Sequence, residues 1–480
     1  MSESKTLSKL VATTPHFGKV EYLSALEIRD DGVDPAEARF CTVTFDAIPM
    51  QLLPFLRRAT SQEILDASDT ALSFLLMEAE IPMSDFRQAE KNGGWCTLTV
   101  SDDPDAMASG EFYKATALEF SPEGQEFTPT ILYVRVNSSQ PAPKDLKVLK
   151  RITECRHHPS AVFDNLGTQP KDDLFIVVYD VGQANMCAIL GDGCEPKAFF
   201  DFGWPITTKR WSSPNCLGFD PLAGDDPANP SPVLLSHLDW DHWGFAYLSG
   251  RPTRDVRGFW KTHVTYRPGA LDRPWVMRRP SESMKLGISH AHLLFQLQNQ
   301  ILHDGSRALK FWPSARAQIQ WGACVLFACT PAHSTQDAKY LRNNLALGLL
   351  VENPQSHYYQ RVLLCGDADY TSIASRYKQS LCGIVAPHHG GRITPNSIPA
   401  PSAYTHVHPR MVFSTHEGCY SQIPSADTIH EASMLEWWIS RTDERLKCMC
   451  GHAERRNRWF SLSTVSTPGS CQSCSCWCYP

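Results

Sequence analysis

The sequence predicts an α/β protein in which a smaller α+β domain precedes a larger domain built on a buried sheet. From about residue 172 the chain contains short apolar runs without polar alternation, which are typical of strands covered on both faces. Several of these runs end in turns rich in Gly, Asp and His, where α/β proteins place ligand sites. The runs span residues 174–179, 186–190, 198–200, 233–235, 323–328, 345–351 and 361–365.

Composition and charge restrict the class of protein. The 480 residues are 42% hydrophobic and 20% charged, which is typical of a globular protein with a large core. A net charge of −6 provides no global positive field, so any site for a polyanion must be local. No apolar leader or membrane-length apolar run occurs, and 17 cysteines are an odd number that favours reduced thiols. We therefore expect a soluble cytoplasmic protein that does not contact membranes.

The first 140 residues form the expected α+β domain. Strands are predicted at residues 39–45, 95–100 and 131–136, and Thr60 with Glu63 predicts a capping box before a helix that runs to Leu76. No ligand spacing or phosphate-binding loop occurs here, so the role we expect for this domain is accessory, either binding a protein partner or gating substrate. Composition places a linker at 141–171, the larger domain at 172–466 and a Cys-rich tail at 467–480.

The densest chemistry lies directly after the strand predicted at 233–235. The stretch that begins at Ser236 places His237, Asp239, Asp241 and His242 within six residues, between an apolar strand and Trp243. Two imidazoles and two carboxylates suit a divalent ion of the zinc or manganese type. The alternative is a solvated polar loop, which the coincidence of a buried strand, alternating ligands and flanking tryptophans disfavours.

Three later strands end in further potential ligands. His333 follows the strand at 323–328, and Asp367 follows the strand at 361–365 after Gly366. The pair His388 and His389 follows an apolar run at 384–387, and we choose His388 because it comes first after the strand. A carboxylate such as Asp367 at the end of a buried strand is suited to bridging two ions.

A basic stretch at 251–280 separates these ligands. It carries eight Lys and Arg residues, with Trp260, Tyr266 and Trp275 interleaved. Positive charge with stacking rings suits a phosphate-bearing substrate such as DNA or RNA, and a solvated basic face is the alternative. The side chains that we expect to contact substrate are Arg273, Arg278 and Arg279.

Taken in order, these motifs resemble the metallo-β-lactamase superfamily, and within it the ComEC-like branch. The resemblance covers residues 172–466, and Asp239 in place of the second His of the usual metal motif is the feature that favours this branch. Ala184 and Asn185 depart from the branch pattern, as does Ala346 after Asn344. The motifs that carry the resemblance are Asp180–Gln183, Phe200–Gly203, His237–His242, Asn343–Asn344, Gly366–Asp367, Pro387–Gly390, Met411–Ser414 and Cys419–Pro424.

The resemblance implies a four-layer αββα sandwich that binds two divalent ions, with zinc the first choice and manganese the second. It implies hydrolysis of phosphodiester bonds by a metal-activated water, as in a nuclease or a nucleotide phosphodiesterase that serves DNA processing or bacterial defence. Asn344 is expected to contact substrate. One ion would be bound by His237, Asp239 and His333 and the other by Asp241, His242 and His388, with Asp367 bridging and with Asp241, His242 and Asp367 as the catalytic residues.

Two other functions remain open. The same centre could hydrolyse a small ester, lactone or phosphate, because this superfamily supports many reactions. A non-catalytic interaction protein with a structural metal site is the third reading. The Cys-rich end of the chain adds a candidate structural zinc site, for which the ligands would be Cys448 and Cys450 from the larger domain and Cys471 and Cys474 from the tail.

Overall fold

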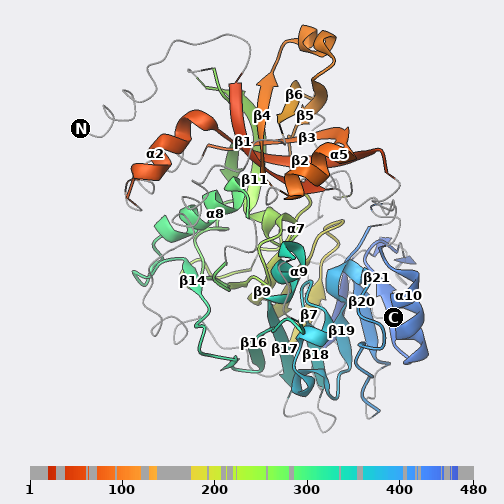
Figure 1. The fold of residues 1–480 in the computed structure, drawn as a ribbon. Helices are drawn as coiled ribbons and strands as arrows, with labels where there is room; N and C mark the ends of the chain where they lie inside the picture. Colours follow the sequence, from red (N-terminus) through yellow and green to blue (C-terminus); the bar gives the residue numbers. More distant parts are fainter. Residues whose placement is uncertain are drawn as a thin grey trace. The chain divides into compact units, whose positions relative to one another are not determined.

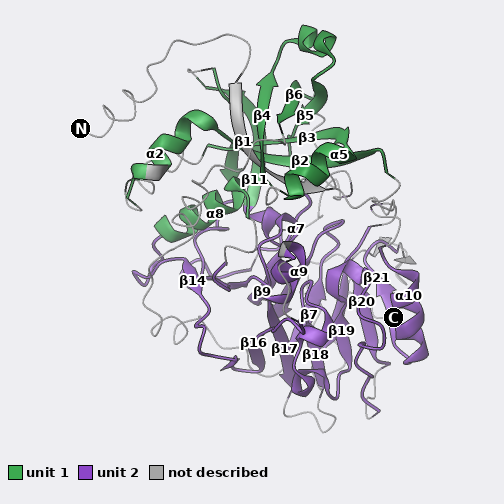
Figure 2. Cartoon of the chain, viewed as in Figure 1, with its two compact units in different colours: residues 1–156, 247–266, 285–300 green, residues 157–246, 267–284, 301–480 purple. Residues whose placement is uncertain are grey.

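The computed structural model folds into two compact units (Figures 1 and 2). Unit 1 comprises residues 1–156, 247–266 and 285–300, and unit 2 comprises 157–246, 267–284 and 301–480. No helix in the described part of the chain is long and apolar enough to cross a membrane. The structure describes residues 20–28, 38–60, 63, 73–91, 95–120, 129–137, 174–191, 194–206, 212, 220–222, 224–255, 258–280, 286–333, 337–353, 360–403, 408–416, 419, 423–444, 446–447, 454–455 and 457–462.

Unit 1 is built on a closed barrel of six strands in the order β1-β2-β3-β5-β6-β4. The strands predicted near residues 39, 95 and 131 are confirmed as β2, β4 and β6. Alternating apolar side chains of β2 and β3, such as Val43, Phe45 and Met77, fill the barrel interior. The strands are β1 (Val20–Ile28), β2 (Phe40–Pro49), β3 (Leu75–Pro82), β4 (Trp95–Ser101), β5 (Tyr113–Ala117) and β6 (Ile131–Asn137).

Short helices connect the barrel strands, and one predicted helix is partly wrong. The capping box is present, because the Thr60 backbone N–H donates to Glu63 Oε2 at 2.7 Å and Glu63 N–H donates to Thr60 Oγ1 at 3.2 Å. Leu75 and Leu76, however, belong to β3, where both are buried in the sheet. The helices are η1 (Met50–Leu52), α2 (Leu53–Arg58), α5 (Met83–Lys91) and η2 (Pro104–Ser109).

Two segments from the middle of the chain complete unit 1. The hairpin of β11 (Tyr247–Arg254) and β12 (Trp260–Tyr266) bonds to the barrel, where Thr262 N–H donates to Phe74 O at 2.7 Å and Leu76 N–H donates to Thr262 Oγ1 at 2.9 Å. Helix α8 (Ile288–Asn299) is capped by Asp46 of β2, whose carboxylate accepts from the Ser289 N–H and hydroxyl. The linker predicted at 141–171 lies outside the described residues.

Unit 2 contains two seven-stranded sheets that pack face to face. Apolar residues of both, such as Ile176 and Leu234 from one sheet and Leu326 and Leu364 from the other, form a single buried cluster. The first sheet has the order β14-β13-β10-β9-β8-β7-β24. Its strands are β7 (Phe175–Val178), β8 (Met186–Leu190), β9 (Pro196–Phe202), β10 (Val233–Leu234), β13 (Trp275–Met277), β14 (Leu309–Phe311) and β24 (Arg458–Ser461).

The second sheet has the order β15-β16-β17-β18-β19-β20-β21, and its outer face packs against α10 (Ala426–Met434) through Ala432. The structure thus shows a mixed α/β unit with paired sheets, and a complete four-layer sandwich stays a prediction. The strands are β15 (Gln318–Trp321), β16 (Cys324–Ala328), β17 (Leu347–Asn353), β18 (Gln360–Leu364), β19 (Gly383–Val385), β20 (Arg410–Phe413) and β21 (Trp438–Arg441).

The remaining short elements of unit 2 lie in the connections between strands. Helix α7 follows β10 and carries two of the predicted ligands, and α9 precedes β17. A small two-stranded sheet, β22 with β23, lies near the end of the described chain. The bounds are α7 (Trp240–Trp243), η5 (Gly244–Ala246), α9 (Ala338–Asn344), η7 (Tyr370–Ser372), η8 (Ser375–Lys378), η9 (Pro387–Gly390), β22 (Leu446–Lys447) and β23 (Glu454–Arg455).

Candidate metal centre

The candidate centre of unit 2 lies where β10, β18 and β19 end. Strand β10 leads into Ser236 and the ligand-rich turn, β18 leads into Gly366 and Asp367, and β19 leads into η9. Gly366 has a φ of +54°, and a Cβ there would lie 2.4 Å from the Ser236 side chain. A glycine is therefore required where these two turns meet, and it allows Asp367 to approach the histidines.

One ligand group comprises His237, His242 and Asp367. All three side chains are buried, and one ligand atom from each lies within 4.8 Å of the others. His242 Nε2 is 3.2 Å from Asp367 Oδ1, and His237 Nε2 is 3.8 Å from Asp367 Oδ2. The separations suit three ligands around one ion rather than three unrelated polar groups.

A second group comprises Asp241, His242 and His389, with ligand atoms again within 4.8 Å of one another. Asp241 Oδ2 lies 3.1 Å from His389 Nε2, and Asp241 Oδ1 lies 3.9 Å from His242 Nε2. The Asp241 side chain is 31% exposed, whereas that of His389 is 4% exposed. Asp241 therefore faces the open side of the centre.

Outer partners fix which nitrogen of each imidazole faces the centre. His242 Nδ1 lies 2.8 Å from Asp201 Oδ2, His237 Nδ1 lies 3.0 Å from Ser236 Oγ, and His389 Nδ1 lies 2.8 Å from the Ser414 carbonyl. The three Nε2 atoms are left to face the carboxylates. Such outer partners select the tautomer and the ring orientation of a metal-binding His.

Electrostatics favour positive charge at the centre. Burial opposes ionisation of Asp367, but His242 and His388 hold its pKa well below the usual value. Burial also opposes the charged form of His242, yet Asp367, Asp201 and Asp241 raise its pKa well above the usual value. The carboxylates thus stabilise a cation in their midst, whether a proton on imidazole or a divalent ion.

The donor set fits a divalent metal ion. Three potential ligand atoms of the centre are buried and have no hydrogen-bond partner among the described residues. They are His237 Nε2, His242 Nε2 and Asp367 Oδ1. Buried polar atoms are costly when unpaired, so a ligand that they share is the simplest explanation. Imidazole with carboxylate suits zinc or manganese.

The structure brings together five of the predicted ligands and separates others. His237, Asp241, His242 and Asp367 join the groups, and His389, not the preferred His388, joins Asp241. His388 instead lies 2.7 Å from Asp367 Oδ2 through its Nδ1. Asp239 belongs to neither group. It lies beside Arg342, with Arg342 Nε 2.5 Å from Asp239 Oδ1.

His333 is exposed, and its ring stacks on Tyr340 with centroids 5.1 Å apart. It belongs to neither ligand group. The residues that follow it, 334–336, lie outside the described part of the chain. Position after a strand does not by itself bring a side chain to the centre, because His333 follows β16 and is exposed.

The two asparagines of α9 have different surroundings. Asn344 is buried, its Oδ1 accepts from Asp369 N–H at 3.0 Å and from Ser372 Oγ at 2.7 Å, and its Nδ2 donates to Tyr340 O. It therefore holds the turn after β18. Asn343 Nδ2 lies 3.4 Å from His388 Nδ1, which places Asn343 rather than Asn344 beside the centre.

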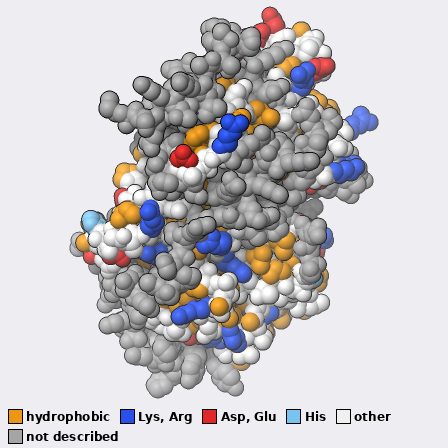
Figure 3. Space-filling view, turned by 60° about the vertical axis from the view of Figure 1, so that its left-hand side comes forward, with side chains coloured by type: hydrophobic (Ala, Val, Ile, Leu, Met, Phe, Trp, Pro, Cys, Tyr) orange, Lys and Arg blue, Asp and Glu red, His pale blue; other side chains and the backbone are white. Residues whose placement is uncertain are grey.

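The three predicted substrate arginines also differ. Arg273 is buried and pairs with Asp225 at 2.7 Å, while Arg278 donates to the Cys329 carbonyl at 2.6 Å. Arg279 is exposed, with its guanidinium carbon 4.5 Å from the Phe311 ring centroid. On the face drawn in Figure 3, Lys and Arg side chains stand in several small groups separated by other residue types.

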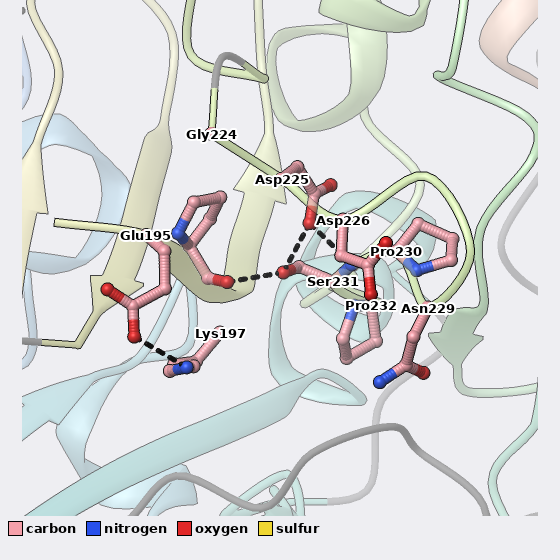
Figure 4. Close-up of a pocket in the computed structure, with 10 residues that line it drawn as sticks. Glu195, Lys197, Gly224, Asp225, Asp226, Asn229, Pro230, Ser231 and Pro232 are labelled. Atoms are coloured by element: carbon pink, nitrogen blue, oxygen red, sulfur yellow. Dashed lines mark hydrogen bonds and ion pairs between the residues drawn. The ribbon is translucent and has the colours of Figure 1, made fainter. Parts of the chain in front are cut away.

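A pocket of about 200 Å³ lies at the start of β9, lined also by residues within 224–232, which precede β10 and the ligand turn in the sequence (Figure 4). Its wall contains the ion pair of Glu195 and Lys197, and Ser231 Oγ bonds to Asp225 and to the Pro196 carbonyl. These polar groups already satisfy one another. The predicted cysteine ligands Cys448, Cys450, Cys471 and Cys474 lie outside the described residues.

Comparison with known proteins adds little to this geometry. No protein-family model matches the chain, and no curated protein matches it. Among solved structures, the Rm3 metallo-beta-lactamase is similar at 12% sequence identity with a TM-score of 0.19, over 59% of this chain and 82% of that chain. At that TM-score, the likeness assigns no role to any residue of this chain.

Several residues of the centre lack a spacing signal in the sequence. Asp201 is fully buried and accepts from the Ser236 N–H and hydroxyl at 2.7 and 2.9 Å. Its position at the end of an apolar strand and its place in the Phe200–Gly203 motif do not mark it as a partner of His242. Arg342 approaches Asp239 from α9, more than a hundred residues later in the chain. Only the tertiary fold shows that these side chains belong to the centre.

Proposed function

We propose that unit 2 is a metal-dependent hydrolase of phosphodiester bonds. The observation that carries this proposal is the set of buried, mutually facing ligand atoms of His237, His242 and Asp367, which have no hydrogen-bond partner among the described residues. A structural site would normally be closed on all sides. Here Asp241 and His388 remain 31% and 27% exposed, so substrate can approach from their side.

The residues of the centre have two different roles in this proposal, binding the ion and orienting water. His237, His242, His389 and Asp367 would hold the ion, while Asp241 lies at the open side and can orient an attacking water. A divalent ion in such a centre polarises a phosphoryl oxygen and lowers the pKa of water. Asp201, Ser236 and Ser414 keep the imidazole rings in place, so the ligands need little reorganisation when substrate binds.

Arginines near the centre favour an anionic substrate over a neutral ester. Strands β10 and β13 are parallel, with Leu234 opposite Val276, so Arg278 and Arg279 leave the sheet at the edge where Ser236 and His237 begin. Arg342 pairs with Asp239 and therefore adds no net charge to this edge. We include nucleic acid strands and nucleotides among the candidate substrates because both present phosphodiesters to such a cationic edge.

Turnover tests the proposal directly. The full chain is incubated with bis(p-nitrophenyl) phosphate, with single- and double-stranded DNA and with RNA, each in the presence of Zn²⁺ or Mn²⁺. Asp241→Asn and His242→Ala should each abolish cleavage, and Asp226→Asn, which changes an exposed carboxylate of the same unit, should not. Hydrolysis of carboxylic esters alone would replace the phosphodiester assignment, and absence of bound metal would overturn the whole proposal.

Salt dependence tests the cationic edge. Replacing Arg278 and Arg279 with Gln should weaken DNA binding and should reduce the slope of log K against log salt by about 1–2. An unchanged slope would show that neither guanidinium contacts phosphate. Arg273→Gln is not a suitable probe, because that side chain is buried against Asp225.

A further inference from the structure

Arg342 places a fixed positive charge at the rim of the candidate centre. Helix α9 begins after Asp337, whose carboxylate accepts from the N–H groups of Lys339 and Tyr340 at 2.9 and 3.2 Å. From the last turn of this helix, Arg342 Nε reaches to 2.5 Å from Asp239 Oδ1. The two side chains are only 12% and 14% exposed, so water screens their attraction weakly. The pair is therefore a fixed part of the centre.

Asp239 is thereby drawn away from a role as a metal ligand. Its Oδ1 lies 2.5 Å from Arg342 Nε as an ion pair, and its Oδ2 lies 3.5 Å from His237 Nε2. Asp239 belongs to neither group of mutually close ligand atoms. His333, the other side chain expected to complete a site around Asp239, is exposed and stacks on Tyr340.

The remaining ligands converge on one imidazole. His242 belongs to both groups, yet its Nδ1 lies 2.8 Å from Asp201 and only Nε2 faces the other ligands. One nitrogen lone pair binds one ion. His242 can therefore serve only one ion, and we treat the two groups as a single site around it, with His237, Asp367 and His389 as further ligands and Asp241 at the open side.

We propose that this chain holds one tightly bound divalent ion at His242 and that the Arg342–Asp239 pair occupies the place of a second ion. This inference rests on the proposed function and replaces the two-ion composition that the sequence resemblance implies. The guanidinium cancels the charge of Asp239, so a second cation there would meet a positive neighbour instead of an open carboxylate.

The number of ions bound per chain tests the one-ion inference, and it can be measured without an activity assay. The full chain is stripped with a chelator and titrated with Mn²⁺, which prefers oxygen and nitrogen ligands and so avoids the cysteines of the tail. Electron paramagnetic resonance separates free Mn²⁺ from bound Mn²⁺, and also isolated ions from spin-coupled pairs. We expect one tight equivalent per chain with the signal of an isolated ion.

Variants of Arg342 test whether this side chain is what limits the chain to one bound ion. Arg342→Gln should allow a second, weaker equivalent with a spin-coupled signal, whereas Arg342→Lys keeps the charge and should stay at one. His333→Ala should leave one equivalent with unchanged affinity. If Arg342→Gln also stays at one, Arg342 does not exclude the second ion and the inference is wrong.

The wild-type titration separates the two proposals. Two tight equivalents with a coupled signal would overturn the one-ion inference and leave the hydrolase proposal standing. Loss of one equivalent in His333→Ala would overturn it in the same way. No binding of Mn²⁺ or Zn²⁺ at His242, shown by identical titrations of wild type and His242→Ala, would overturn both.

Discussion

His242 Nδ1 lies 2.8 Å from Asp201 Oδ2, and neither side chain is exposed to solvent. Asp201 also accepts from Ser236 and from Asn185 Nδ2, the latter at 3.1 Å, and it adopts a φ of +58°. A non-glycine residue at such a φ is uncommon and marks a position that its surroundings hold in place. Asp201 therefore orients His242 although it does not belong to either ligand group.

The first prediction concerns this orienting carboxylate. Asp201→Asn should lower metal affinity about 10–100-fold, because outer partners of a ligating His typically contribute that much. Affinity is measured by competition with a chromophoric chelator. Asp226→Asn, an exposed carboxylate in the same unit, is the control and should leave affinity unchanged. Equal affinity in Asp201→Asn and wild type would show that His242 does not need this partner.

The second prediction compares the neighbouring histidines of η9. Both have left-handed backbone, with φ of 53° at His388 and 56° at His389, so Asn is the matched replacement because it tolerates that conformation. His389→Asn should lower metal affinity by more than the roughly 10–100-fold typical of an outer partner. His388→Asn should lower it by less, because its Nδ1 contacts Asp367 from a half-exposed position. The reverse order would restore His388 as the ligand.

Residue pattern alone predicts the parts of this protein that local sequence controls. The apolar runs of unit 2 become β7, β8, β9, β10, β16, β17 and β18, since a strand buried on both faces needs a continuous apolar sequence. The turn after β10 likewise delivers His237 and His242 to one place. Such strands and turns can be predicted from sequence because each depends mainly on its own residues.

Long-range contacts explain the rest. The sequence around His388 and His389 does not predict which of the two rings contacts Asp241. That contact depends on the left-handed backbone of η9 and on the carbonyl of Ser414, which follows β20. Arg342 similarly meets Asp239 only once α9 lies over the turn after β10. The barrel of unit 1 is equally nonlocal, since β1 pairs with both β2 and β4 to close it.

The third prediction concerns a buried ion pair in unit 2. Arg273 and Asp225 side chains are 3% and 6% exposed, so Arg273→Met leaves an uncompensated buried carboxylate. The free energy of unfolding should fall by about 3–5 kcal/mol, measured by urea denaturation. Arg279→Ala is the control and should cost only about 0.5–1 kcal/mol, since it removes an exposed contact with Phe311. A similar loss in both variants would contradict the structural role of Arg273.

The fourth prediction concerns thiol reactivity as pH changes. Burial raises the pKa of Cys382 to about 11 and that of Cys329 to about 12. The thiolate is the reactive form, so at pH 8 only about one Cys382 in a thousand is ionised and labelling by iodoacetamide should be slow. In the unfolded chain, thiols return to a pKa of about 8.5 and should react quickly. Mass spectrometry of labelled peptides measures the difference, and fast labelling of native Cys382 would contradict its burial.

The last prediction tests whether α8 belongs to unit 1. Asp46 of β2 is 1% exposed, and its carboxylate accepts from Ser289 N–H at 3.0 Å and from Ser289 Oγ at 2.6 Å. Asp46→Ala removes this cap and leaves two donors unpaired in a buried place, which costs about 1–3 kcal/mol. Hydrogen exchange of the α8 amides should therefore accelerate, while amides of β5 and β6 on the barrel stay protected. Asp103→Ala removes the exposed cap of η2 in the same unit and should accelerate exchange only there. If α8 exchanges equally in Asp46→Ala and wild type, the Asp46 carboxylate is not what anchors this segment to the barrel.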